Sequence, residues 1–196
     1  EFFEEEPQKP QVRQRQVWIE VEEPKVEEWT EEVEISDDSQ AQLLEIVLDV
    51  SPSMNGDNIC VAIALAAVLL GKHLDDGSRY LFRQFAGNMG KLRVAETTAE
   101  KQRFITFLVD QKKDHGVTDG TDIKLAIDTA AADVRKKATR DEEPEILLIT
   151  DGGAELTSDD IYGAIGDDVV LHSVNVGYEI NWSLADKSSS YYQIRW

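Results

Sequence analysis

Segments that are apolar along nearly their whole length alternate, in this chain, with segments of helical pattern. Leu43–Leu48 and Ile146–Thr150 are the clearest, and Arg79–Phe85 and Val169–Val176 are similar. A strand that is apolar on both faces needs cover on both, which is typical of parallel sheets enclosed by helices. The gap between Arg79–Phe85 and Lys91–Ala95 is short enough for a hairpin. The sequence therefore predicts an α/β fold of the doubly wound type: an open, mostly parallel sheet with helices on both faces and one antiparallel edge strand.

Helical patterns fill the intervals between these strands. They are expected over Asn58–Leu74, Thr98–Val109, Thr121–Lys137 and Ser158–Ile165. The first is apolar nearly all round, so we expect it to be buried, with Cys60 as a small apolar residue inside it. Tyr191–Trp196 is the expected last strand. Its residues Tyr192, Ile194 and Trp196 form one apolar face that should pack inward.

The first 40 residues differ in composition from the rest of the chain. They hold 14 acids and four bases, within a net charge of −19 for all 196 residues. Such acidic runs are usually solvated, but Val17, Ile19 and Val21 alternate as a half-buried strand would. We therefore predict an acidic N-terminal extension, 1–40, that lies on a domain formed by 41–196. The overall charge argues against binding to nucleic acid or to an anionic membrane.

Cysteine content and hydropathy indicate the compartment. Cys60 is the single cysteine, which excludes an internal disulfide and fits a reducing environment. The longest apolar run, Ile59–Leu70, has 12 residues and is too short to span a bilayer. We expect a cytoplasmic protein without a membrane partner. The chain begins at Glu1 rather than Met, so the absence of a signal sequence carries little weight.

Short oxygen-bearing side chains follow the two most apolar strands. In "LDVSPSM", Asp49, Ser51 and Ser53 occupy alternate positions at the end of the first strand, and Asp151 follows "EILLIT". In an open α/β sheet, ligands bind beyond the carboxyl ends of the strands, where the strand order reverses. If the two strands are neighbours, both carboxylates project into one crevice.

The loop "HGVTDGTDI" descends to the same edge and adds the oxygens of Thr118, Asp119, Thr121 and Asp122. The predicted metal site consists of Asp49, Ser51, Ser53, Thr121 and Asp151. Hard oxygen donors favour Mg²⁺, or else Mn²⁺ or Ca²⁺, over zinc, and the sequence has no competing His/Cys cluster. Taken singly, Thr121 fits a helix N-cap equally well, and Asp151-Gly152-Gly153 fits an ordinary turn.

Together, "LDVSPSM", "GTDI" and "LLITDG" resemble the three parts of the metal-ion-dependent adhesion site of von Willebrand factor A (VWA) domains, over residues 43–180 or so. The resemblance implies a Rossmann-like sheet and a metal touched directly by Ser51, Ser53 and Thr121. It implies that Asp49 and Asp151 act mainly through water or hydrogen bonds. It also implies binding to a protein that offers an Asp or Glu to the metal.

The closing "SLADKSSSYYQIRW" is similar to the ends of VWA proteins encoded beside MoxR-type AAA+ ATPases, the CoxE-like and ViaA-like group. This resemblance implies a MoxR-like AAA+ ATPase as a partner. The chain has no G-x-x-x-x-G-K-[ST] motif, so the ATPase would be a separate protein.

Two other functions compete with a metal-dependent protein-binding module. One is an extracellular adhesion domain, which a signal peptide on the full-length protein would favour. The other is a metal-dependent hydrolase. Phosphoaspartyl hydrolases need a second acid two residues after the first, and here that position is Ser51. We therefore expect no enzymatic activity.

Overall fold

The computed structural model describes residues 42–72, 77–110, 114 and 117–195. The predicted N-terminal extension, with its alternating Val17, Ile19 and Val21, lies outside these residues. Among the described helices, none combines the length and the apolar character needed to cross a bilayer.

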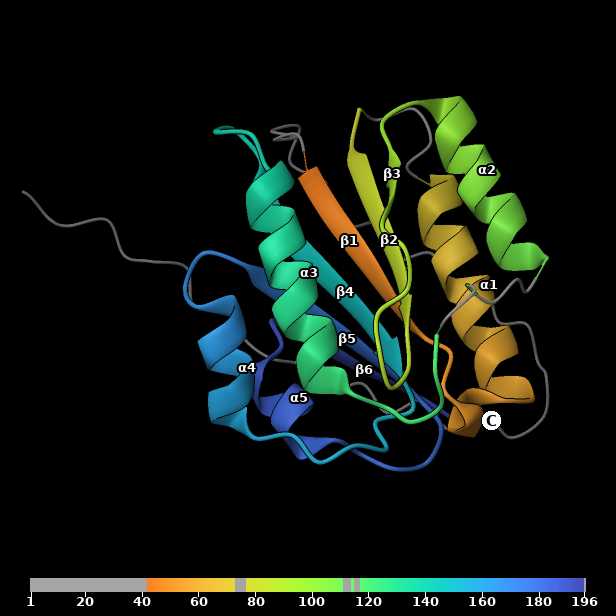
Figure 1. Ribbon diagram of the computed structural model, residues 1–196, viewed down its shortest axis with the longest axis vertical. Coiled ribbons are helices and arrows are strands. Elements are labelled where there is room, and N and C mark those ends of the chain that lie inside the picture. Colours follow the sequence, from red (N-terminus) through yellow and green to blue (C-terminus); the bar gives the residue numbers. More distant parts are fainter. Residues whose placement is uncertain (1–41, 73–76, 111–113, 115–116, 196) are drawn as a thin grey trace, which may run out of the picture.

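The described strands form one sheet in the order β3-β2-β1-β4-β5-β6 (Figure 1). Its members are β1 (Gln42–Asp49), β2 (Arg79–Phe85), β3 (Arg93–Ala95), β4 (Glu143–Thr150), β5 (Val170–Val176) and β6 (Ser190–Ile194). All neighbouring pairs are parallel except β2 and β3, which are antiparallel. The strand order reverses between β1 and β4, because the chain moves outward to β2 and then crosses to β4. The predicted α/β fold is confirmed, including its antiparallel edge strand.

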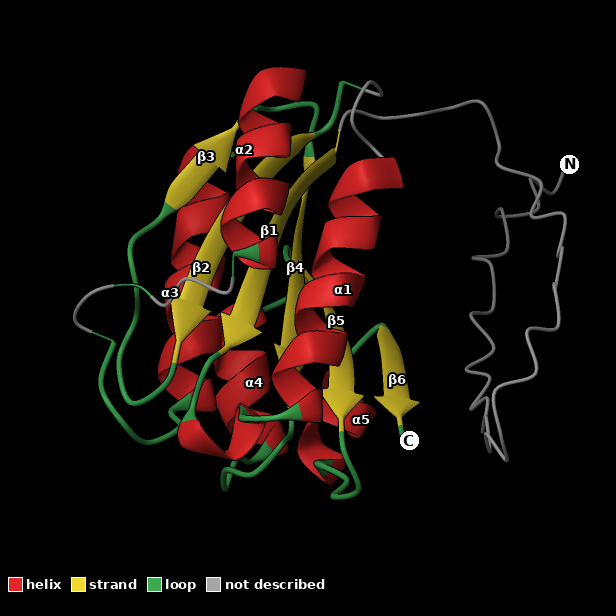
Figure 2. Ribbon diagram, turned by 90° about the vertical axis from the view of Figure 1, so that its right-hand side faces the viewer, coloured by secondary structure: helices red, strands yellow, loops and turns green. Residues whose placement is uncertain are grey.

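Helices cover both faces of this sheet. The elements are η1 (Pro52–Met54), α1 (Asp57–Lys72), α2 (Thr98–Val109), α3 (Ile123–Lys137), α4 (Ser158–Ile165) and α5 (Trp182–Lys187). Figure 1 shows α1 and α2 on one side of the sheet and α3, α4 and α5 on the other, and Figure 2, turned by 90°, shows the strands next to one another with helices in front of and behind them. Residues of β1 alternate between the two cores: Leu43 and Val47 pack with α3 and α4, whereas Ile46 and Leu48 pack with α1 and α2. This double cover explains why the strand is apolar on both faces.

The burial of α1 differs from the prediction. Its inner face, which includes Ala62, Ala66 and Leu70, is buried, but Val68 is 55% exposed and Cys60 is also exposed. The expectation of a wholly buried helix, with Cys60 inside it, is wrong. A helix that lies on one face of a sheet buries only the side toward the sheet, whatever the polarity of its outer side.

The C-terminal segment holds two further differences. Tyr192 is 58% exposed, so the predicted inward face of the last strand is wrong at this residue, whereas Ile194 does pack against the core. β6 is an edge strand, and the helices cover it incompletely. Its neighbour Tyr191 packs against the core on the opposite face. The short helix α5, which Asn181 caps by accepting a hydrogen bond from the Leu184 backbone N–H, was not predicted.

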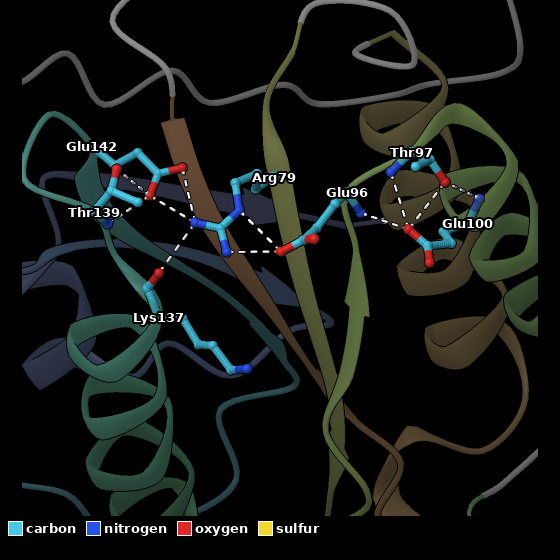
Figure 3. A network of polar contacts seen from close by, with 7 residues as sticks. All are labelled: Arg79, Glu96, Thr97, Glu100, Lys137, Thr139 and Glu142. Carbon is cyan, nitrogen blue, oxygen red and sulfur yellow. Dashed lines mark hydrogen bonds and ion pairs between the residues drawn. The ribbon is translucent and has the colours of Figure 1, made fainter.

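A polar network ties the elements together at the amino end of the sheet (Figure 3). Arg79, at the start of β2, donates to Glu96 before α2 at 2.8 Å, to Glu142 before β4 at 2.9 Å and to the carbonyl oxygen of Lys137 at the end of α3. Thr97 and Glu100 form a capping box that begins α2. The network anchors both helix layers at this end and leaves the carboxyl end of the sheet free for a site.

Candidate functional site

Asp49 ends β1 at the carboxyl edge of the sheet and is fully buried. The Ser51 backbone N–H donates to its Oδ1 at 2.8 Å, and the Thr150 hydroxyl donates to its Oδ2 at 2.6 Å. Thr150 reaches Asp49 because β4 pairs directly with β1. Both oxygens of the carboxylate therefore accept hydrogen bonds from the protein. This arrangement suits a carboxylate that does not bind a metal directly, but orients the groups that do and balances the charge of the ion.

Ser51 and Ser53 present their hydroxyls side by side. The two Oγ atoms are 3.0 Å apart, and Ser51 is buried whereas Ser53 is exposed. Ser51 has an extended backbone, and Pro52 at the first position of η1 then turns the chain back within two residues. Adjacent ligands in an octahedral Mg²⁺ shell, each about 2.1 Å from the ion, lie about 3 Å apart. The observed spacing fits two hydroxyls bound to one such ion.

Asp151 lies close enough to Asp49 for the two charges to interact. Burial raises the pKa of Asp49, hydrogen bonds from Thr150 and Ser51 oppose this, and the negative charge of Asp151 raises the pKa again. A divalent cation beside this pair would relieve the repulsion and favour the ionised form. Asp151 also accepts a hydrogen bond from the Gly153 backbone N–H at 3.3 Å, so it makes the expected turn while facing the same edge.

The loop that carries Thr121 reaches this edge through a close backbone contact. The Asp122 N–H donates to the carbonyl oxygen of Ala86 at 2.8 Å. At Gly87 a Cβ atom would lie 2.2 Å from the carbonyl oxygen of Asp119, so only glycine permits the approach. Figure 1 shows the start of α3 at the same end of the sheet as the loops that follow β1 and β4. Asp119 and Ser51 line one cavity, which brings the two loops together.

Thr121 itself is not the N-cap of α3. Asp122 takes that role and accepts a hydrogen bond from the Leu125 backbone N–H at 2.9 Å. The capping alternative for Thr121 is therefore wrong. Thr118 is held elsewhere, because its hydroxyl donates to Asn88. The structure thus joins Asp49, Ser51 and Ser53 by hydrogen bonds and sets Asp151 beside them, whereas Thr121 joins the group through the position of its loop.

The five candidate residues offer more hydroxyl groups than carboxylates. Only two of them are acids, and three are hydroxyls. Among the described residues, no three His, Cys, Asp or Glu side chains converge into an alternative metal site. A hydroxyl-rich set of this kind suits a hard cation that keeps part of its shell open.

Sequence comparison places this chain within a known family. The profile of the von Willebrand factor type A domain matches residues 44–154, which is more than half of the chain and includes all five candidate residues. The chain belongs to the VWA domain family. A search of curated proteins gave no match.

Solved structures agree with the fold of this VWA domain. An aerotolerance-related membrane protein from Bacteroides fragilis, solved with multiple mutations to serines, has 17% identity and a TM-score of 0.64 over 79% of this chain and 92% of its own. A von Willebrand factor type A protein from Catenulispora acidiphila has 17% identity and a TM-score of 0.58, over 80% of this chain and 39% of its own. The SpRpn10 VWA domain has 11% identity and a TM-score of 0.57, over 79% and 88%. At these identities the likeness concerns the fold alone.

Two residues that support the candidate site were not predicted from the sequence. Thr150 stands directly before Asp151 in "LLITDG", and a polar residue at the end of a buried strand was the available signal. Asn181 donates to the carbonyl oxygens of Gly152 and Ala154 at 3.3 and 3.2 Å, and so holds the loop that follows Asp151. Nothing in the sequence pattern indicates this second role, because Asn181 lies about 30 residues along the chain from its partners.

Proposed function

We propose that this VWA domain is a metal-dependent protein-binding module, in which a divalent cation captures an acidic side chain of a partner. The hydroxyls of Ser51, Ser53 and Thr121 would hold the ion directly, and Asp49 and Asp151 would hold it through water or hydrogen bonds. The observation that carries the proposal is the pair of serine hydroxyls, 3.0 Å apart, beside a fully buried carboxylate. Mg²⁺ is the expected ion, with Mn²⁺ or Ca²⁺ as alternatives.

The partner's acid follows from coordination and charge. Mg²⁺ takes six oxygens, and three neutral hydroxyls leave positions that water fills until a stronger donor arrives. The carboxylate of Asp49 already accepts hydrogen bonds from Ser51 and Thr150, so it would not take up a coordination position on the ion. A carboxylate from outside is the donor that best completes such a shell.

The domain's own charge favours particular partners. Of the chain's net charge of −19, residues 1–40 carry −10 (14 acids and four bases) and the predicted domain, 41–196, the remaining −9, which repels an acidic protein at long range. The partner segment should therefore be basic around its inserted acid. From the resemblance of the C-terminal segment, we propose a MoxR-like AAA+ ATPase, or a client delivered to it, as this partner, and the cytoplasm as the compartment.

We propose a binding role rather than an enzymatic one. A phosphoaspartyl hydrolase would need an acid two residues after Asp49, and Ser51 occupies that position. Ser51 itself is buried and shares its hydroxyl with Ser53 rather than with a base. This arrangement supports coordination of a cation and provides no activated nucleophile.

The test is calorimetric titration of the chain with Mg²⁺ and Mn²⁺, compared with a variant that carries Ser51→Ala and Ser53→Ala. We expect binding by the wild type and its loss in the variant, with circular dichroism showing that the variant is still folded. Asp141→Asn, at an exposed position at the opposite end of β4, is the control and should bind normally. Equal binding by the double variant would refute the site.

The partner is tested by capture of a purified MoxR-like ATPase. We expect capture with Mg²⁺ and its loss with EDTA or with the double serine variant. Capture that survives both treatments would show that the interaction uses another surface.

A further inference from the structure

A cavity of about 240 Å³ adjoins the proposed metal site. It lies between the loop after β1, the first turns of α1 and the end of α2, and it shares Ser51 with the metal site. Figure 1 shows the start of α1 at the loop after β1, and the end of α2 beside α1. Since one water occupies about 30 Å³ in the liquid, the space is much larger than a single ordered water requires.

The wall of this cavity has an apolar part, and the polar side chains of Ser51, Asn55 and Gln84 line the rest. Met54, Ile63 and Leu108 are buried side chains that line it, and Val50 and Ile59 are partly buried beside them. Water against the apolar part finds few hydrogen-bond partners, so its displacement from there by an apolar group is favourable.

The charge at the cavity decides which part of a ligand enters it. Among the described residues that line it, Asp119 is the charged one, and it is exposed. A carboxylate near Asp119 would be repelled, so a partner's acid belongs on the cation and not in this cavity. An apolar side chain, in contrast, gains contact with Met54, Ile63 and Leu108.

We infer that the cavity receives an apolar side chain, such as Leu, Met or Phe, from the residues next to the partner's acid. The inference rests on the proposed metal-dependent function and adds to it a second anchor, beside the ion. The recognised motif is then an Asp or Glu with an apolar neighbour in the partner segment. The metal supplies affinity for the charge, and the cavity selects among acidic segments. Burial of one Leu side chain corresponds to about ten- to a hundredfold in affinity.

The two methionines of the chain, Met54 and Met89, give a direct readout. Met54 lines the cavity, whereas Met89 packs against the core on the other face of the sheet. Protein labelled with ¹³C at the methionine methyl groups has one signal inside the cavity and one internal control.

The experiment selects peptides that bind the full chain from a library with a fixed central Asp and random flanks, in Mg²⁺ and in EDTA. We expect Mg²⁺-dependent peptides with Leu, Met or Phe next to the Asp. They should shift the Met54 signal and leave Met89 unchanged, and replacement of the apolar residue by Ala should weaken binding about tenfold or more. Ile59→Ala should reduce this preference, whereas Val68→Ala, on the exposed side of the same helix, should not.

The outcomes separate the two proposals. Mg²⁺-dependent peptides without an apolar preference and without a Met54 shift would overturn the cavity's role and leave the metal site standing. Peptides that shift Met54 equally in Mg²⁺ and EDTA would overturn the metal-dependent function and retain the cavity as an apolar site. Failure to select any peptide in either condition would overturn both.

Discussion

A buried carboxyl group should make the stability of this domain fall as the pH rises. Glu45 lies at the centre of β1, fully buried, and neither of its oxygens has a hydrogen-bond partner among the described residues. The nearest cation is Arg83, with Nε 3.7 Å from Glu45 Oε1. Arg83 directs its donors elsewhere, to Asp133 at 2.7 Å and to the carbonyl oxygen of Gly90 at 2.7 Å. Burial, and then the negative charge of Asp133, raise the pKa of Glu45 from 4.5 to about 9, against the opposing effect of Arg83.

The sign of the effect follows from proton binding. The pKa of Glu45 is higher in the folded state than in the unfolded chain. Between pH 4.5 and about 9, the folded protein therefore still holds a proton that the unfolded chain has already released. The free energy of unfolding should therefore fall by about 1.4 kcal/mol per pH unit in this window. Between pH 4.5 and pH 7 the loss is about 3 kcal/mol. Acids with a lowered pKa, such as Glu142 and Asp114, act in the opposite direction but only at lower pH.

The assay is urea denaturation of the wild type and Glu45→Gln at several values from about pH 5 to pH 8. Glutamine keeps the shape and cannot titrate, so the stability of the variant relative to the wild type should rise by about 1.4 kcal/mol per pH unit. Glu143→Gln makes the same chemical change at an exposed position of the next strand and should leave the pH dependence unaltered. If Glu45→Gln instead lowers stability by a constant amount across this range, Glu45 is ionised and paired with Arg83, and the reasoning is wrong.

Two further predictions concern the supports of the candidate site. Thr150→Val removes the hydroxyl that donates to Asp49 at 2.6 Å, so the pKa of Asp49 should rise further and Mg²⁺ affinity should fall about tenfold in calorimetry. Unchanged affinity in a folded Thr150→Val variant would contradict this role. Gly87→Ala would place a Cβ atom 2.2 Å from the carbonyl oxygen of Asp119, so it should displace the loop of Thr121 and lower both thermal stability and Mg²⁺ affinity. Gly71→Ala, in α1 where a Cβ meets nothing within 4 Å, should raise the free energy of unfolding by about 0.5–1 kcal/mol, and a matching gain at Gly87 would disprove the close contact.

The order of apolar and polar residues along the chain determined much of this structure. A strand enclosed on both faces must be apolar at successive positions, so β1 and β4 were predictable from their composition. The bounds of α2 were predictable as well, because Thr97 and Glu100 form its capping box through contacts within one turn. The sequence also predicted that Asp49 and Asp151 follow neighbouring strands, and the pairing of β1 with β4 confirms this position, whereas the role of the five candidate residues stays a prediction. Their metal remains a prediction.

Tertiary structure decided the features that depend on residues far apart in the chain. Cys60 and Tyr192 are exposed because no described element covers their side of α1 or of β6, and no local pattern contains that information. The Thr150 hydroxyl donates a hydrogen bond to Asp49, about 100 residues earlier in the chain, only because β4 pairs with β1. Glu45 interrupts an apolar strand in the sequence, but its raised pKa depends on burial between packed elements and then on the charge of Asp133, which α3 brings to the same face of the sheet. The burial and the electrostatic surroundings of a group depend on its neighbours in space. The sequence therefore shows which ionisable groups are present, and the fold determines their pKa values.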